Sequence, residues 1–264
     1  MALALILSVA LLFASVCPRV SALDSGQKLG PGKARPQPPT PAAIQVPFRV
    51  GEKLNYRILW SKFSIHAGTL RLIAVERGPF YGAQAWHFQA VAHTVDSMRV
   101  VYTLDDQFDS YTEQAALTGL QYEVHVREQG KQQDSIFRMS KDGDPAPASG
   151  AAVRVSPGTR DPIGLIYYLR AVDWQRTKEV NSPIFDGHKL YEVKARLQRE
   201  RGEASVPAGN YTASSIEVRV FEHGADVPDT HFWLWLAQDA ARTPVLIEAE
   251  VPLGTARVEL THAG

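Results

Sequence analysis

The sequence lacks several features that would point to a particular chemistry. It contains one cysteine, Cys17, so an intrachain disulfide cannot form and a site built from several thiolates is excluded. Basic and acidic side chains balance at 28 each, so the basic excess that general nucleic-acid binding requires is missing. The longest uncharged apolar run is shorter than the roughly 18 residues of a membrane-spanning helix. We therefore expect neither nucleic-acid binding nor a transmembrane span.

Motifs of common active sites and metal sites are also missing. There is no His-Glu-x-x-His pattern, no Gly-x-Ser-x-Gly turn and no calcium-loop spacing. The eight histidines are scattered, and His87 and His93, although on one strand face, lie about 20 Å apart along a strand. The sequence therefore predicts isolated surface histidines, no metal site, no cofactor and no enzymatic activity.

The N-terminus resembles a secretory signal peptide. An uncharged apolar run extends from Ala2 to Val16, and Val20-Ser21-Ala22 places small residues where a signal peptidase cleaves. Cleavage after residue 22 would release a periplasmic protein without its only thiol. The alternative is a lipid anchor at Cys17, but Val16 stands where lipoprotein signals carry Gly, Ala or Ser. We therefore expect the cleaved, unanchored form.

Residues 23–47 read as a proline-rich linker. Six prolines interrupt any helix or strand ladder there and favour extended, disordered chain: Pro31, Pro36, Pro38, Pro39, Pro41 and Pro47. Such a segment either spaces a domain from another object or is mere slack, and both interpretations stay open.

From residue 48 to residue 264 the dominant pattern is alternation of apolar and polar side chains. A period of two with one wet face is typical of antiparallel strands. It is clearest over residues 54–60, 120–127, 191–198, 216–220 and 245–251. About ten strands, several near ten residues long, favour a mainly all-β domain with a single antiparallel sheet. Strands of that length predict a strongly curved or barrel-like sheet, because curvature reduces exposed edges.

One segment, residues 161–170, reads as a helix. Asp161 is a good N-cap, Pro162 suits the first helical position, and Arg170 complements the dipole in the last turn. Its apolar residues surround most of the helix, so we expect one short buried helix against the concave side of the sheet.

Large aromatic and charged residues supply the candidate ligand contacts. Trp233 and Trp235 alternate with Phe232, Leu234 and Leu236, so both faces of that strand are apolar. One face is core, and the other lines a cavity, covers a helix or meets a partner. Asp239 and Arg242 either orient each other across a turn, which is favoured, or face a ligand. The full candidate set is Tyr56, Trp60, Trp86, Tyr168, Arg170, Trp233, Trp235, Asp239 and Arg242.

The order of several short motifs resembles the exported bacterial family called domain of unknown function 3108. The resemblance covers residues 48–262. The segments that carry it are Phe48-Arg49-Val50-Gly51-Glu52-Lys53-Leu54 with Tyr56 and Trp60, Ala67-Gly68, Asp161-Pro162-Ile163, Tyr167-Tyr168-Leu169-Arg170, Val206-Pro207-Ala208-Gly209 and residues 235–245. The resemblance implies an envelope protein with a signal peptide and a mainly antiparallel β domain, similar in shape to lipoprotein-carrier folds. It implies no established activity.

Three functions are compatible with these features. The first is a non-enzymatic envelope protein whose curved sheet holds a lipid, an acyl chain or a protein partner. The second is a structural scaffold with a filled core. The third, ranked lowest, is a carboxylate-based cell-wall hydrolase, which needs a close carboxylate pair in a cleft. An open or a filled concave side separates the first two.

Overall fold

The computed structural model describes residues 44–60, 65–140, 151–228, 230–251 and 254–264. The predicted signal peptide, Cys17 and residues 23–43 of the predicted linker lie outside the described residues. Residues 44–47, the end of that linker, lie against the domain: Ile44 N donates to Ala115 O at 2.9 Å, and Val46 packs on the core.

Strands make up most of the described chain. Their bounds are β1 Lys53–Trp60, β2 Ile65–Phe80, β3 Ala83–Thr94, β4 Asp105–Glu113, β5 Gly119–Glu128, β6 Lys131–Ser140, β7 Ala151–Arg154, β8 Glu179–Phe185, β9 Leu190–Val206, β10 Gly209–Glu222, β11 Ala225–Asp226, β12 Phe232–Ala237, β13 Pro244–Val251 and β14 Gly254–Ala263. The described residues contain 14 strands, more than the about ten that the alternation predicts. Strands β7, β8 and β11 are short or lack a clear period of two, so the alternation did not reveal them.

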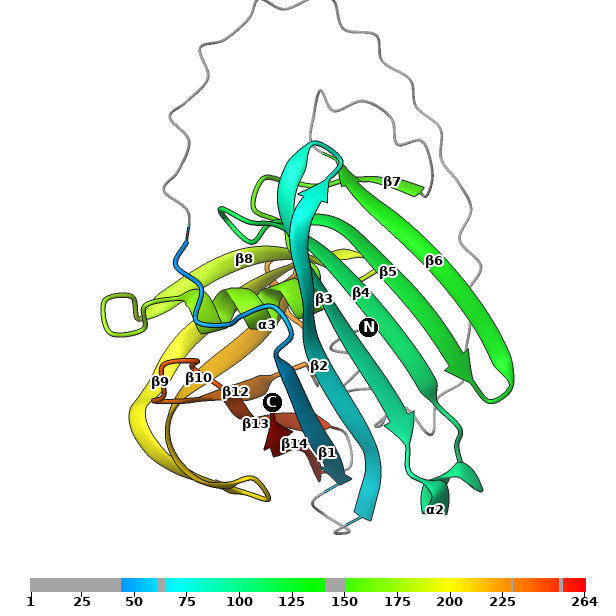
Figure 1. Cartoon of the computed structure of the whole chain (residues 1–264), viewed down its shortest axis with the longest axis vertical. Coiled ribbons are helices and arrows are strands. Elements are labelled where there is room, and N and C mark those ends of the chain that lie inside the picture. Colours follow the sequence, from blue (N-terminus) through cyan, green and yellow to red (C-terminus); the bar gives the residue numbers. More distant parts are fainter. Residues whose placement is uncertain (1–43, 61–64, 141–150, 229, 252–253) are drawn as a thin grey trace, which may run out of the picture.

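All the strands belong to one curved sheet, with α3 in its hollow (Figure 1). The strand order is β7-β6-β5-β4-β3-β2-β1-β14-β13-β12-β10-β9-β8, and β11 pairs with β10. Neighbours pair antiparallel except β6 and β7, which are parallel. The prediction of a single, strongly curved, mainly antiparallel sheet is therefore confirmed.

In each alternating strand, every second side chain points into the hollow of the sheet, and these side chains fill it. In β1, Leu54, Tyr56 and Ile58 are buried, and the intervening residues are not. Burial of this kind stabilises the domain by about 25 cal/mol per Å² of apolar surface. Phe48 packs edge-on against Trp86 and against Tyr167 of α3, so the sheet and the helix share one core.

Helix α3, Pro162–Ala171, is the predicted buried helix. The Asp161 carboxylate accepts from the backbone N–H groups of Ile163 and Gly164, which confirms it as the N-cap.

A second helix, α2, was not predicted. It is one exposed turn, Asp96–Arg99, with no buried residue, too short to leave a helical period in the sequence. Among the described residues, no helix is long and apolar enough to cross a membrane.

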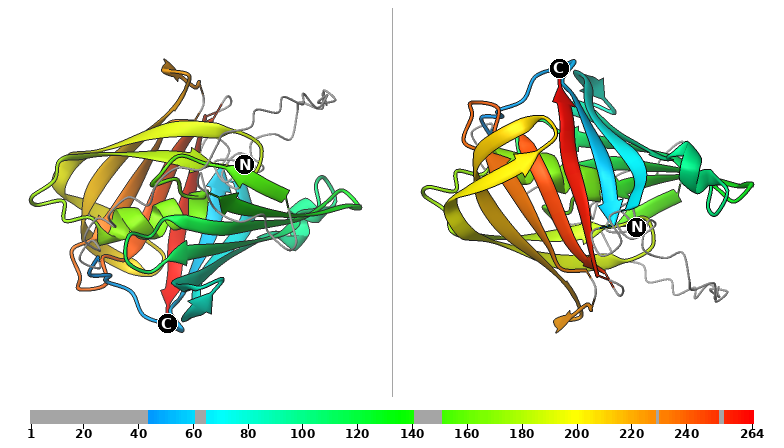
Figure 2. Two further views of the ribbon diagram at one scale, coloured as in Figure 1. Left: turned by 90° about the horizontal axis from the view of Figure 1, so that it is seen from above. Right: turned by 90° about the horizontal axis from the view of Figure 1, so that it is seen from below.

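The segment before α3 connects the edge strand β8 to β5, near the opposite edge of the sheet. Thr159 O accepts from Gly119 N at the start of β5, while Arg160 pairs with Ile184 of β8 as a parallel bridge. The Arg160 guanidinium donates to Ser182 Oγ of β8 and to Ala116 O before β5, both at 2.9 Å. The hollow is thus closed at the N-terminal end of α3. Figure 2 shows strands from both ends of the strand order beside the helix.

Candidate functional site

The C-terminal end of α3 is anchored by a buried ion pair. Arg170 is fully buried, and its two terminal nitrogens donate to the carboxylate of Glu52 at 2.6 and 3.0 Å. One of them also donates to Ala241 O at 3.0 Å. Burial acts to lower the pKa of Arg170, but the hydrogen bond and charge of Glu52 outweigh it, so the pKa lies above its ordinary value. Arg170 is therefore engaged within the protein.

Two further charged residues shape the same end of the helix. Arg242 Nη1 donates to the carbonyl oxygens of Arg170 and Val172, which have no partner inside the helix. Asp239 accepts from the backbone N–H and the hydroxyl of Thr243, at 3.0 and 2.7 Å. Both contacts are intramolecular, and both residues still face the space described next.

A pocket of about 730 Å³ opens beside this end of α3. Its size lies in the range of roughly 300–1,000 Å³ that small-molecule pockets occupy. It is lined by Val172, Asp173, Trp174, Gln175, Leu197, Glu200, Arg201, Ser214, Leu236, Ala237, Gln238, Asp239 and Arg242. The apolar members come from the inner face of the sheet and the chain after α3, whereas the polar members form the rim. Trp174 is fixed in place because its Nε1 donates to Leu169 O at 2.9 Å.

A β-bulge places charged side chains on this rim. The pairing of β9 with β10 shifts register between Ala213 and Ile216, so extra residues of β9 lie opposite fewer residues of β10. Bulges of this kind redirect side chains, and they are common beside functional sites. Ser214 Oγ and Gln238 Nε2 both donate to Glu200 O, at 2.7 and 2.8 Å, which fixes the bulge.

The rim carboxylates already have partners, but one rim cation is available to a ligand. Asp239 is engaged by Thr243, and Glu200 Oε2 lies 3.7 Å from Lys178 Nζ. Arg201 is exposed and donates through Nε to Gln238 Oε1 at 3.3 Å. A ligand with an anionic group therefore meets a guanidinium at the mouth and apolar side chains deeper inside.

Other members of the candidate set lie in the core, as Tyr56 and Trp86 do, or pack against it, as Tyr168 does. Tyr56 is 2% exposed, and its hydroxyl donates to Pro244 O at 2.8 Å. Burial raises the pKa of Tyr56 well above its usual value. Trp86 is equally buried and stacks on Phe88. Tyr168 lies under the guanidinium of Arg160, 3.5 Å from the ring centroid.

The remaining tryptophans lie away from α3. Trp233 and Trp235 point to the outer face of the sheet, since Phe232, Leu234 and Leu236 fill the inner one. Together with Glu248 they line a second, open space of about 420 Å³, here called the outer hollow. The Glu248 carboxylate accepts from Trp235 Nε1 at 3.0 Å. Trp60 ends β1, about 23 Å along the strand from Lys53.

The structure thus brings Arg170, Asp239 and Arg242 together and places Trp233 and Trp235 at a separate hollow. Sequence reasoning missed Trp174, Glu200 and Arg201. A usable signal was present, because four consecutive polar residues at 198–201 interrupt the alternation of a long strand, as a bulge does. Nothing local in the sequence indicated that this bulge faces α3.

Comparison with known proteins agrees with the resemblance in the sequence. Residues 55–261 match the family described as "Protein of unknown function (DUF3108)". The chain belongs to this family. A comparison with curated proteins finds no significant match.

Three solved structures resemble this family member at low identity. A beta-barrel-like protein of domain of unknown function DUF1849 from Brucella abortus has 9% identity and a TM-score of 0.48, over 84% of this chain and 99% of that one. A predicted exported protein with a YmcC-like fold from Bacteroides fragilis has 10% identity and a TM-score of 0.39. The match covers 84% of this chain and 100% of the Bacteroides protein. A predicted lipoprotein from Parabacteroides distasonis has 8% identity and a TM-score of 0.40. The match covers 84% of this chain and 99% of the Parabacteroides protein. These values are too low to carry over a function.

Proposed function

We propose that this protein is a non-enzymatic envelope protein that binds an amphipathic, anionic molecule in the pocket at the C-terminal end of α3. A fatty acid or a lysophospholipid has the required chemistry. The observation that carries the proposal is the pocket itself, with apolar side chains inside and Arg201 and Arg242 at its rim.

The composition of the pocket favours an amphipathic molecule over a bare hydrocarbon. Eight of its 13 lining residues are polar or charged, and five are apolar. Transfer of an acyl chain out of water gains about 0.8 kcal/mol per buried CH₂, and a guanidinium at the rim pairs with a carboxylate or phosphate. Leu197 and Leu236 are placed to contact the chain, while Arg201 contacts the head group.

The envelope location rests on the predicted signal peptide. N-terminal sequencing of the protein from the envelope fraction tests it, and a start at residue 23 is expected. A start at an acylated Cys17 would place the same domain on a membrane surface, and an uncleaved chain would contradict export.

A binding experiment with paired variants tests the proposal. Dodecanoate or lysophosphatidylglycerol is titrated into the purified protein, and tryptophan fluorescence is followed. We expect saturable binding and a higher melting temperature, because a ligand that binds only the folded state stabilises it. Arg201→Ala should weaken binding at least fivefold. Arg199→Ala is the matched control, because Arg199 lies on the same strand but lines the outer hollow. Equal binding by both variants, or none by the parent protein, contradicts the proposal.

A second candidate function is a scaffold for a protein partner. It is favoured by the filled centre of the hollow, where Tyr167 stacks 3.7 Å from Phe88 and Phe48 packs edge-on against both rings. On this account the outer hollow at Trp233 and Trp235 is the contact surface. Loss of a co-purifying envelope partner in a Trp233→Ala variant, with no lipid bound by the parent protein, would favour it.

A further inference from the structure

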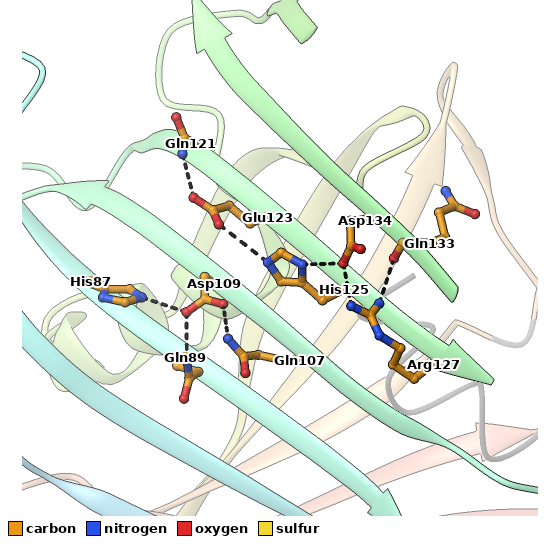
Figure 3. Close-up of polar contacts among 10 residues, drawn as sticks. All are labelled: His87, Gln89, Gln107, Asp109, Gln121, Glu123, His125, Arg127, Gln133 and Asp134. Atoms are coloured by element: carbon orange, nitrogen blue, oxygen red, sulfur yellow. Dashed lines mark hydrogen bonds and ion pairs between the residues drawn. The ribbon is translucent and has the colours of Figure 1, made fainter. Parts of the chain in front are cut away.

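A cluster of metal-ligating side chains lies on the outer face of the sheet, opposite the core. Asp109 of β4 faces Glu123 of β5 across the strand pair, and Gln107 faces His125. Oxygen atoms of Asp109 and Glu123 and a ring nitrogen of His125 all lie within 4.8 Å of one another. Figure 3 shows the three side chains converging between the strands. The pocket beside α3 contains none of them.

Neighbouring side chains hold each of the three groups in place. Both oxygens of Asp109 are engaged, Oδ1 by His87 Nε2 and Gln89 Nε2 and Oδ2 by Gln107 Nε2, at 2.7–2.9 Å. Gln121 Nε2 donates to Glu123 Oε1 at 2.6 Å. These amides and the imidazole fix the carboxylates from outside the cluster.

The orientation of His125 is the most specific feature. Its Nδ1 lies 2.7 Å from Asp134 Oδ1, and its Nε2 lies 3.5 Å from Glu123 Oε2. When Nδ1 carries the proton and donates it to Asp134, the lone pair of Nε2 points into the cluster. A carboxylate that orients the distal nitrogen of a histidine is the usual support of a metal ligand.

Within the part of the chain that the structure describes, no lysine or arginine pairs with the carboxylates of Asp109 and Glu123. Among the described residues, the basic partners of Asp109 and Glu123 are His87 and His125, and a histidine is charged only when it is protonated. Two carboxylates directly opposite each other on neighbouring strands repel. A bound cation would remove this repulsion.

We propose that Asp109, Glu123 and His125 bind a divalent transition-metal ion of the zinc type. One imidazole and two carboxylates form a nitrogen-and-oxygen donor set that suits Zn²⁺ and leaves a position for water. Ca²⁺ and Mg²⁺ prefer oxygen ligands alone, so they fit this set less well. The side chains of Asp109, Glu123 and His125 are 5%, 17% and 27% exposed, which shelters the site yet leaves it accessible.

The distances are compatible with a tetrahedral ion after small side-chain rotations. Ligand atoms about 2.0–2.2 Å from zinc lie about 3.3–3.6 Å from one another at the corners of a tetrahedron. The separation of 3.5 Å between Glu123 Oε2 and His125 Nε2 already meets this value. All three ligand atoms lie within 4.8 Å of one another, so Asp109 has to approach by at most about 1.3 Å, with its hydrogen bonds to His87, Gln89 and Gln107 adjusting.

Calorimetric titration of ZnCl₂ into the purified protein, prepared without a histidine tag, tests the site. We expect one ion per chain, a rise in melting temperature and weaker binding of CaCl₂. His125→Gln and Glu123→Gln should each weaken zinc binding at least tenfold, and Asp134→Asn by about 10–100-fold through loss of the orienting carboxylate. His93→Gln is the matched control, because His93 forms a similar pair with Asp105 but belongs to no group of three potential metal ligands among the described residues.

The outcomes separate the metal site from a purely structural cluster. Imidazole ¹⁵N signals of His125 should shift at Nε2 when zinc is added, and circular dichroism should show that each variant remains folded. Absence of saturable zinc binding would overturn the proposal. So would binding that His125→Gln and His93→Gln weaken equally. Neither result depends on the pocket at α3, so this site and the proposed function fail or survive independently.

Discussion

The two ends of α3 bury charge in different ways. At the N-terminal end a single carboxylate, Asp161, accepts from two backbone N–H groups and from Ser110 Oγ at 2.6 Å. At the C-terminal end the charge of Arg170 is matched by Glu52. Burial raises the pKa of Asp161 to about 6, although its hydrogen bonds act to lower it, whereas Arg170 is held charged. In this helix the hydrogen bonds of Asp161 do not offset the effect of burial on its pKa, whereas Glu52 more than offsets the effect of burial on the pKa of Arg170.

The two ends also differ in access. Arg160 and the segment before α3 join β8 to the start of β5 and close the N-terminal end. At the other end, the pocket lies between the bulge of β9, the turn at Asp239 and the chain that follows α3. Under the proposed function, the closed end therefore serves stability and the open end binds the ligand.

The largest effect is expected from breaking the ion pair at the open end. Arg170→Ala leaves Glu52 buried without its partner, so the free energy of unfolding should fall by about 3–5 kcal/mol. Urea denaturation measures this change. The double variant Arg170→Met with Glu52→Leu is the control, since removal of both charges should restore much of the loss. A single variant as stable as the parent would show that the pair contributes nothing.

The next effect is a pH dependence that belongs to the closed end. The folded pKa of Asp161, about 6, lies above the unfolded value of about 4, so the folded state binds the extra proton between these values. Stability from this group is therefore present below about pH 4 and is lost as the pH rises through 6. Relative to Asp161→Asn, the protein should lose about 2–3 kcal/mol between pH 4 and pH 7.

Urea denaturation of the two proteins at several pH values measures this difference, and the subtraction removes the contribution of other titrating groups. A constant difference from pH 4 to pH 7 would show that Asp161 titrates normally in the folded state.

The smallest effect concerns the cap itself. Asp161→Asn and Asp161→Ala are both uncharged, but only Asn keeps an oxygen that accepts from Ile163 N and Gly164 N. We expect the Ala variant to be less stable than the Asn variant by about 0.5–2 kcal/mol at every pH. Thermal or chemical denaturation of the pair checks this, and equal stability would assign no energetic role to the cap.

Local patterns in the sequence were sufficient to predict the sheet and α3. A period of two identified β1, β5, β9, β10 and β13, and Asp161, Pro162 and Arg170 marked both ends of the helix. The sites depended on register, which no local pattern specifies. Glu52 and Arg170 are 118 residues apart, and the opposition of Asp109 to Glu123 follows only from the pairing of β4 with β5.

The most direct test of the difference between the ends follows the five tryptophan indole N–H signals by NMR while dodecanoate is added. The tryptophans report different places: Trp174 the pocket, Trp86 the core, Trp233 and Trp235 the outer hollow, and Trp60 the end of β1. Binding at the open end of α3 should shift the Trp174 signal saturably and leave the Trp233 and Trp235 signals in place. Saturable shifts confined to Trp233 and Trp235, or no shift at all, would contradict the account.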